Sequence, residues 1–373
     1  MALVYAAGAA NPGSQHSAGR KARQALEAAR DSIMALLGAR IESHRADRLI
    51  FTSGGTEANN LAILGMAGPR PAHAIVSALE HPSVLGPADH LRRLGWGVDK
   101  LPAATTGVVQ IDDLASRLKP ETRLVSIMLA NNETGVLQPI AEAARICAER
   151  GVPLHVDAVQ AAGKVPVDFA ALGAAALTIS AHKFHGPVGI GALILRQDVQ
   201  ITPQTHGGFQ EGGLRPGTEP VALAVGMQAA LEHWHNDRDR IAARMTSLRD
   251  QFETALRAGW PDIVIHGANA DRLPHTSNVA FPGLARQALV MALDLAGVSC
   301  ATGSACASGS SEPSPTLVAM GLPHSLVEGS LRFSLGQQTT PLEVVQATGR
   351  ILNICNELRT RKMEQKSLLC RSP

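Results

Sequence analysis

The sequence has few cysteines and no excess of charge of either sign. Its five cysteines are odd in number and scattered, with no Cys-x-x-Cys pair, so neither a disulfide framework nor a zinc site is predicted. The 34 basic and 32 acidic residues leave a formal charge of +2, which gives no electrostatic reason to expect nucleic acid as a partner. We expect the cysteines to act, if at all, as free thiols.

Long apolar runs are also missing. No run reaches the roughly 18–20 residues that a membrane helix needs, and residues 1–8 show no charged leader followed by an apolar stretch. We therefore expect a cytoplasmic protein without a membrane partner. A chain of 373 residues is long for one core, and its composition changes near residue 236, where a charged helical segment begins. Two domains are predicted, 1–236 and 237–373.

Short apolar runs of strand length recur through the first domain, with longer helical segments between them. These runs are Leu49–Ser53, Ala74–Leu79, Leu124–Leu129, Pro153–Val156, Ala175–Ser180 and Ala192–Leu195. Crossovers of this length are typical of parallel strands covered by helices, so the fold class is α/β. An amphipathic helix is predicted over 17–37, and the second domain mixes helices with short strands at 278–281 and 330–334.

The segment 175–191 brings reactive side chains to the end of one predicted strand. Its small and β-branched residues are followed by Ser180, His182 and Lys183, and then by glycines and a proline that end the element. Lysine is seldom buried without a partner or a task, and a lysine with a lowered pKa can form a Schiff base with an aldehyde. A lone lysine after a strand is more often a surface residue, so the neighbouring motifs decide the interpretation.

A Gly-Gly turn between a strand and a helix suits a phosphate group. Gly54 and Gly55 allow close approach of the backbone, and Ser53 and Thr56 add hydroxyl donors beside the helix N-terminus. The lysine of a nucleotide-binding P-loop is missing, which argues against a nucleoside triphosphate. Taken alone, the turn is equally compatible with a plain connection.

Further polar groups follow other predicted strands. Asp157 lies in an apolar segment where an unpaired carboxylate would be costly, so we expect a cationic partner such as a protonated ring nitrogen. The stretches 80–83 and 131–135 also end apolar runs, and each could be an ordinary loop. The glycine-rich stretch 207–219 has the length and the donors to reach a ligand or a neighbouring subunit.

Cys306 lies in a run of small residues, 299–311, that cannot pack a core. A cysteine in a mobile, exposed loop is a candidate nucleophile or redox group. Cys147 and Cys355 lie in helical segments and are expected to be buried, whereas Cys300 could be either. A lysine, an aspartate, a phosphate turn and a mobile cysteine together meet the requirements of pyridoxal phosphate chemistry.

The chain resembles cysteine desulfurases of the NifS/IscS type over nearly its whole length. The motifs that carry the resemblance are Ser-Gly-Gly-Thr-Glu (53–57), Glu-His-Pro-Ser-Val (80–84), Asn-Asn-Glu-Thr-Gly (131–135), His-Val-Asp-Ala-Val-Gln (155–160), Ser-Ala-His-Lys-Phe-His-Gly-Pro (180–187), Leu-Arg-Pro-Gly-Thr-Glu (214–219), Gly-Ser-Ala-Cys (303–306) and Leu-Arg-Phe-Ser-Leu-Gly (331–336). The resemblance implies a fold-type-I pyridoxal phosphate transferase. Its large domain would hold a mostly parallel seven-stranded sheet between helices, and its smaller C-terminal domain would be α+β.

The resemblance also implies an activity. The enzyme would be a homodimer that converts L-cysteine to L-alanine and passes the sulfur, as an enzyme persulfide, to an acceptor such as an iron-sulfur scaffold protein or a thiolation pathway. Lys183 would form the Schiff base with pyridoxal 5'-phosphate and move protons, and Asp157 would pair with the pyridine nitrogen. Cys306 would attack the substrate sulfur and could hold a nascent cluster transiently. Arg332 would clamp the substrate carboxylate.

The remaining contacts implied by the resemblance surround the cofactor ring and its phosphate. His81 would stack on the ring and take part in catalysis, while Asn132 and Gln160 would contact the ring substituents. Asn132 would also contact the substrate. The residues implied for the phosphate are Gly55, Thr56, Ser180 and His182, with Thr218 contributed by the other subunit.

The sequence departs from the family pattern at three places. Phe209 replaces the third glycine of a Gly-Gly-Gly loop, and Val188 stands where a lysine is common. The family normally has an Asp-x-x-Ala-Thr-Thr-like motif ahead of the loop at Asn11, so a chain that starts at Met1 is expected to turn over cysteine slowly. Two alternatives stay open: another pyridoxal phosphate lyase or aminotransferase, such as a selenocysteine lyase, and a catalytically impaired, N-terminally truncated paralogue that acts as a binding partner.

Overall fold

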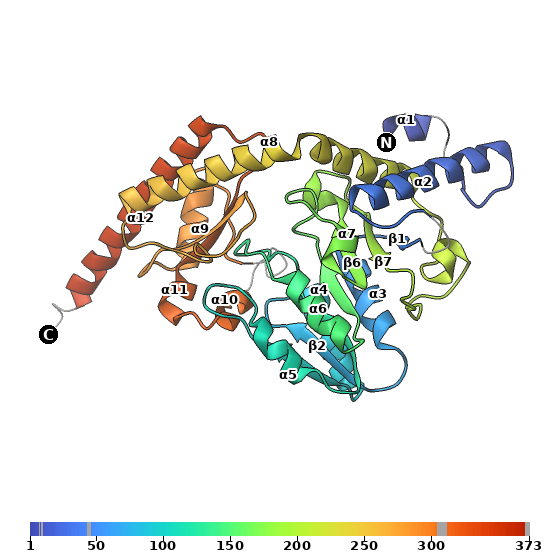
Figure 1. Cartoon of the computed structure of the whole chain (residues 1–373). Helices are drawn as coiled ribbons and strands as arrows, with labels where there is room; N and C mark the ends of the chain where they lie inside the picture. Colours follow the sequence, from blue (N-terminus) through green and yellow to red (C-terminus); the bar gives the residue numbers. More distant parts are fainter. Residues whose placement is uncertain (7, 9, 43–45, 304–311, 370–373) are drawn as a thin grey trace. The chain divides into compact units, whose positions relative to one another are not determined.

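The computed structural model describes residues 1–369 except 7, 9, 43–45 and 304–311 (Figure 1). The chain divides into two compact units. The first comprises Met1–Leu101, Val109–Ala130 and Gln138–Arg238, and the second comprises Pro102–Val108, Asn131–Leu137 and Asp239–Pro373. The second unit therefore includes two short segments from the first half of the chain.

A seven-stranded sheet forms the centre of the first unit (Figure 1). Its strands are β1 (Arg48–Thr52), β2 (His73–Ser77), β3 (Gly97–Leu101), β4 (Thr122–Ser126), β5 (Leu154–Asp157), β6 (Ala176–Ser180) and β7 (Gly191–Leu195), in the order β1-β7-β6-β5-β4-β2-β3. The pairs from β3 to β6 are parallel, and β7 is antiparallel to both β6 and β1. The predicted mostly parallel sheet is confirmed. Strand β3 was not predicted because this edge strand is largely exposed and carries two charges.

The first unit also contains helices, several of which pack against this sheet. They are α1 (Ala2–Ala6), α2 (Ser17–Leu36), α3 (Gly55–Ala67), α4 (Pro82–Arg93), α5 (Leu114–Arg117), α6 (Ile140–Glu149) and α7 (Phe169–Leu172), with the 3₁₀ turns η1 (Ile111–Asp113), η2 (Ala181–Phe184) and η3 (Gln210–Gly213). Helix α2 confirms the helix predicted over 17–37; Leu26 and Ile33 are fully buried on its apolar face, and the His16 side chain accepts from the Gly19 N–H. Helix α3 lies against β4 to β7, and Ala58 and Ala62 allow it to approach closely.

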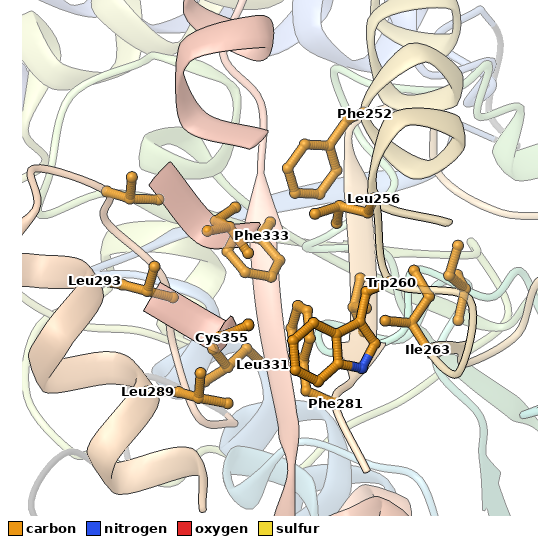
Figure 2. Close-up of a cluster of buried hydrophobic side chains, with 14 of the residues drawn as sticks. Phe252, Leu256, Trp260, Ile263, Phe281, Leu289, Leu293, Leu331, Phe333 and Cys355 are labelled. Atoms are coloured by element: carbon orange, nitrogen blue, oxygen red, sulfur yellow. The ribbon is translucent and has the colours of Figure 1, made fainter. Parts of the chain in front are cut away.

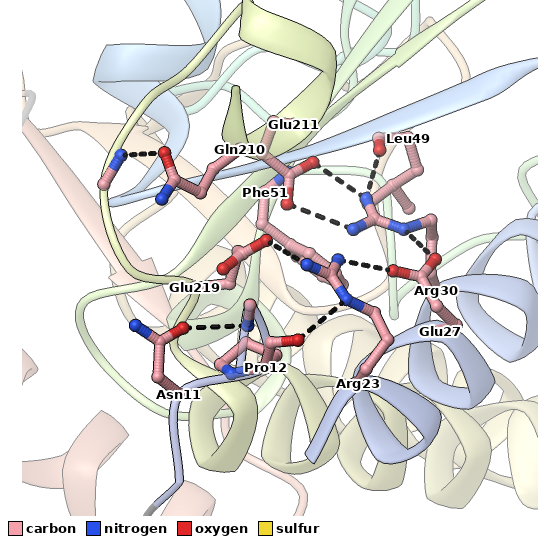
Figure 3. Close-up of polar contacts among 12 residues, drawn as sticks. Asn11, Pro12, Arg23, Glu27, Arg30, Leu49, Phe51, Gln210, Glu211 and Glu219 are labelled. Carbon is pink, nitrogen blue, oxygen red and sulfur yellow. Dashed lines mark hydrogen bonds and ion pairs between the residues drawn. The ribbon is translucent and has the colours of Figure 1, made fainter. Parts of the chain in front are cut away.

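Arginine–carboxylate pairs hold the segment 207–219 against α2 (Figure 3). Arg30 donates to both oxygens of Glu211, at 2.8 and 3.1 Å, and Arg23 donates to Glu219 at 3.0 Å. The two arginines are seven residues apart and therefore lie on one face of the helix. Both carboxylates are buried, so each needs its arginine partner, and the glycine-rich segment has a defined course.

The second unit contains a three-stranded antiparallel sheet and its own core. The strands β8 (Val264–Ile265), β9 (Thr276–Ala280) and β10 (Ser330–Ser334) pair in the order β10-β9-β8, and both strands predicted in this part of the chain are present. The helices are α9 (Arg286–Leu295), α10 (Pro315–Ala319), α11 (His324–Glu328) and α12 (Pro341–Leu369), while α8 (Val221–Gly259) contains residues of both units. Phe252 packs on Phe333 with ring centroids 5.2 Å apart, beside buried Leu256, Trp260 and Leu331 (Figure 2). Within the described part of the chain, no helix has the length and apolar character needed to cross a bilayer.

Candidate functional site

Lys183 lies in the 3₁₀ turn η2, directly after the buried strand β6. His185 closes this turn in the left-handed region, at φ 66°, and the Gly186 N–H bonds to the Ala181 carbonyl at 2.9 Å. The strand end at Ser180 is fully buried, whereas Lys183 is half-buried. The buried strand therefore fixes the backbone of the lysine and leaves part of the residue exposed.

The Gly-Gly turn contacts the same strand end. A Cβ on Gly55 would lie 3.5 Å from the Ser180 Cβ and 2.8 Å from a Val159 methyl group, so any larger residue here would have to displace Val159. Ser180 Oγ lies 3.0 Å from His182 Nδ1, and Thr56 is in the exposed first turn of α3. The amides of a helix N-terminus, two hydroxyls and an imidazole form a donor set that suits a phosphate. Four residues predicted for the phosphate are thus near one another.

The His182 imidazole is held mainly in its neutral form. Burial lowers its pKa, and the positive charges of Lys183 and Lys164 lower it further. A neutral imidazole can still donate one hydrogen bond to an anion.

Asp157 is the last residue of β5 and is 5% exposed. Its Oδ1 accepts from the Val159 N–H at 2.9 Å, and its Oδ2 accepts from Asn59 Nδ2 at 2.7 Å. Burial raises the pKa of the carboxyl above its ordinary value, and these hydrogen bonds and the positive charges of His81 and Lys183 offset part of that rise. A buried carboxylate held by neutral donors is the group that a protonated ring nitrogen requires.

Sequence reasoning missed Asn59, which links Asp157 to His81. Asn59 is 1% exposed in α3, and its Nδ2 also donates to Ser83 Oγ at 2.8 Å. Ser83 Oγ lies 2.7 Å from His81 Nδ1, which also accepts from the Ser83 N–H at 3.1 Å and caps α4. The available signal was the position of Asn59, one helical turn after Gly55. Burial lowers the pKa of His81, and the negative charge of Asp157 opposes this shift.

Glu80 is a second buried carboxyl in this cluster. Its Oε1 accepts from Ser77 Oγ at 2.6 Å and from the Met128 N–H at 2.7 Å. Burial raises its pKa to about 8, and the nearby charge of Asp157 adds to this effect. Glu80 is therefore mostly protonated at neutral pH and adds little negative charge beside Asp157.

Gln160 and Thr218 also belong to the first unit. Gln160 is half-buried, three residues after Asp157, and accepts from Lys164 Nζ at 2.9 Å. Thr218 is exposed on the segment 207–219, next to buried Glu219. The role of Thr218 toward a second subunit stays a prediction.

Arg332 and Asn132 belong to the second unit, where they are in direct contact. Arg332 Nη1 donates to the Asn132 carbonyl at 2.9 Å, and the Arg332 main chain exchanges hydrogen bonds of 3.0 and 2.7 Å with Ala301. Burial lowers the pKa of the guanidinium, and the negative charge of Glu133 opposes that shift. The planar donor fork is thus held on β10 in a form that suits a carboxylate.

The Glu133 carboxylate lies close to residues on both sides of the segment 304–311. Its Oε2 accepts from Ser314 Oγ at 2.5 Å, and a Cβ on Gly303 would lie 3.5 Å from the same oxygen. Cys306, the predicted nucleophile, lies outside the described residues. Burial, together with the charge of Asp294, raises the pKa of Cys300 to about 12 and keeps it a thiol.

Two other cysteines are buried, as predicted. Cys147 is buried in α6 and Cys355 in α12, and burial raises both pKa values to about 12. Neither thiol is suited to act as a nucleophile.

Comparison with known proteins agrees with the motif series. The family described as aminotransferase class-V matches residues 1–346. Cysteine desulfurase IscS of Dictyoglomus turgidum is 42% identical, covering 94% of this chain and 88% of its own; NifS of Azotobacter vinelandii is 39% identical, covering 94% and 86%. The solved NifS-like protein of Rickettsia africae has a TM-score of 0.84 at 31% identity, covering 93% of this chain and 92% of its own. The chain therefore belongs to the class V aminotransferases, among the cysteine desulfurases of the NifS/IscS type.

Proposed function

We propose that the protein is a cytoplasmic, pyridoxal 5'-phosphate-dependent cysteine desulfurase. The observation that carries this proposal is the buried Asp157 carboxylate, held by Val159 and Asn59, in a family that generally uses this cofactor. In the reaction the Cβ–S bond of L-cysteine breaks and an S–S bond forms at Cys306. Cysteine and the enzyme thiol thus become alanine and an enzyme persulfide, so atoms and electrons balance.

The residues of the first unit fit the cofactor. The first-turn amides of α3 at Gly55 and Thr56, the Ser180 hydroxyl and the His182 imidazole provide donors for a phosphate dianion. The Lys183 amine is the group that can bond to the cofactor aldehyde. When bound, the cofactor supplies an electron-withdrawing ring for the substrate α-carbon.

The chain's own residues then hold protons and orient groups. Asp157 would pair with the ring nitrogen and keep a proton there, and the hydrogen bonds from Val159 and Asn59 favour its anionic form against the effect of burial. Lys183 would move the proton of the substrate α-carbon, and His81 would stack on the ring. Arg332 binds the substrate carboxylate through its planar fork. Asn132 and Gln160 would contact the substituents of the ring, and Asn132 would also contact the substrate.

We further infer the partners from the relatives. The proteins named cysteine desulfurase support L-cysteine as the substrate and an acceptor protein, such as an iron-sulfur scaffold, for the sulfur. The enzyme acts as a homodimer in which Thr218 completes the phosphate site of the other subunit. Cys306 holds the persulfide and could transiently ligate a nascent cluster.

The test uses the full chain loaded with pyridoxal 5'-phosphate and supplied with L-cysteine. Alanine and protein-bound persulfide should appear together. Cys306→Ala should keep the cofactor absorbance and bind cysteine but form no persulfide, whereas Cys300→Ala should retain activity because that thiol is not ionised. A wild-type protein that makes no alanine, or a Cys306→Ala variant that makes persulfide at the wild-type rate, would overturn the proposal. Turnover of selenocysteine alone would identify a selenocysteine lyase.

A further inference from the structure

The hydrogen bonds that join Asp157 to His81 have one direction. Asn59 Nδ2 uses one hydrogen for Asp157 Oδ2, at 2.7 Å, and the other for Ser83 Oγ, at 2.8 Å. Ser83 Oγ lies 2.7 Å from His81 Nδ1, and because that nitrogen already accepts from the Ser83 N–H at 3.1 Å, the hydroxyl proton is directed to it as well. The four residues thus form a chain in which Asn59 is the donor to both sides.

The orientation of the Asn59 amide is set by these two acceptors. Its Oδ1 is buried and has no hydrogen-bond partner among the described residues. Turning the amide over would place this oxygen against the Asp157 carboxylate and remove both donors. Leaving Oδ1 without a partner therefore costs less free energy than turning the amide over. It follows that the two hydrogen bonds made by Nδ2 stabilise the site.

We propose that Asn59 and Ser83 are positioning residues that hold Asp157 as an anion and His81 in its Nε2–H tautomer. The proposal deepens the proposed function, since Asp157 and His81 are the groups assigned to the cofactor ring. His81 Nδ1 accepts from both the hydroxyl and the N–H of Ser83, so the proton of the neutral ring must be on Nε2. The other charged or titratable groups that act on this pair are Lys183 and Glu80.

The tautomer determines what His81 can do. With Nδ1 turned to Ser83 and capping α4, the Nε2–H is the donor that His81 presents to other groups. The opposite tautomer would leave Nε2 without a proton. It would also set two donors, the Nδ1–H and the Ser83 N–H, against each other.

The first test reads the His81 ring in cofactor-free protein by NMR of labelled histidine, with its signal assigned by loss in His81→Asn. The wild type should show the Nε2–H form near neutral pH. Ser83→Ala removes the shorter contact to Nδ1, and Asn59→Ala lets the Ser83 hydroxyl turn and accept from Nδ1–H. Both variants keep the Ser83 N–H that donates to Nδ1, so each should raise the fraction of the Nδ1–H form above the wild-type level without converting the ring completely. Ser83→Thr, which keeps the hydroxyl, should restore the wild-type signal.

The second test measures alanine formation in the loaded enzyme. Ser83→Ala and Asn59→Ala should lower kcat by about tenfold to a hundredfold, the range expected for a lost hydrogen bond in a charged network. KM for cysteine should change little. Their effects should not add in the double variant, because both break one chain. Asn60→Ala is the matched control: its Nδ2 bonds to the Thr56 carbonyl within α3, so tautomer and rate should stay at wild-type values.

Two results would overturn the inference: an Nδ1–H ring in the wild type, or Ser83→Ala and Asn59→Ala variants that match Asn60→Ala in both tautomer and kcat. If Asn59→Ala does not fold, Ser83→Ala alone decides. The failure of the proposed function looks different. In that case the wild type would form no alanine while the tautomer shifts in the cofactor-free variants persist.

Discussion

The Asp157 cluster of the first unit and the Arg332 cluster of the second unit hold a buried charge in different ways. Asp157 lies at a strand end and depends on a side-chain donor, Asn59, as well as on one main-chain amide. Arg332 lies within β10, and main-chain groups of Ala301 and Asn132 hold both its backbone and its guanidinium. Substitution of the side chains around Asp157 should therefore change the protonation of that cluster. Substitution of Arg332 should remove its charge but leave the backbone of β10 in place.

The largest effect is expected at Lys183. In Lys183→Ala, the visible absorbance of the lysine-bound cofactor should disappear, and borohydride should no longer fix the cofactor to the protein. The rest of the Asp157 cluster should stay intact, so the cofactor can still bind without a covalent bond. Absorption spectra and peptide mapping of reduced protein measure this. Lys164→Ala is the control, and a wild-type adduct mapped to any other lysine would contradict the assignment.

Arg332 offers the matching experiment in the second unit. Arg332→Gln should raise KM for cysteine about a hundredfold, because a charge-assisted, forked contact to the carboxylate is lost. Arg332→Lys should recover only part of this loss, since a point charge lacks the fork. Main-chain bonds to Ala301 remain, so thermal unfolding should change little. Equal KM values for the three proteins would remove Arg332 from the substrate site.

A smaller effect is expected from the hydroxyl that bonds to Glu133. Ser314→Ala loses a buried hydrogen bond to Glu133 and the cap it gives to Leu317 N–H, which should destabilise the second unit by about 1–3 kcal/mol. Thr340 makes the same two kinds of bond, to Glu343, in an exposed setting. Thr340→Ala should therefore lower the free energy of unfolding, measured in urea, by less than Ser314→Ala does. Equal losses for both variants would show that burial adds nothing here.

The last prediction concerns how the free energy of unfolding changes with pH, through one buried histidine in each unit. Burial lowers the pKa of His155 to about 3 and that of His266 to about 4. Both stay neutral when folded but take up a proton near pH 6.5 when unfolded, so stability falls as pH drops from 6.5 toward these values. Each contributes a slope of at most about 1.4 kcal/mol per pH unit. His155→Gln should flatten the slope between pH 4 and 3, where His266 no longer contributes; an unchanged slope would contradict this cause.

The sequence by itself determined which elements carry chemistry. Apolar runs followed by polar residues placed Lys183 after β6 and Asp157 at the end of β5, and the Gly-Gly pair marked the start of α3. These features are local, because strand length, helix caps and glycine positions depend on neighbours in the chain. The order of the eight motifs then identified the family.

Only the tertiary structure decided how these charges are balanced. Asn59 bonds to Asp157, 98 positions away, and to Ser83, 24 positions away. The protonation of Glu80 likewise depends on burial and on a carboxylate from another strand. Hydrogen-bond direction and desolvation arise only when distant segments pack together, so no periodicity or spacing in the sequence can encode them directly.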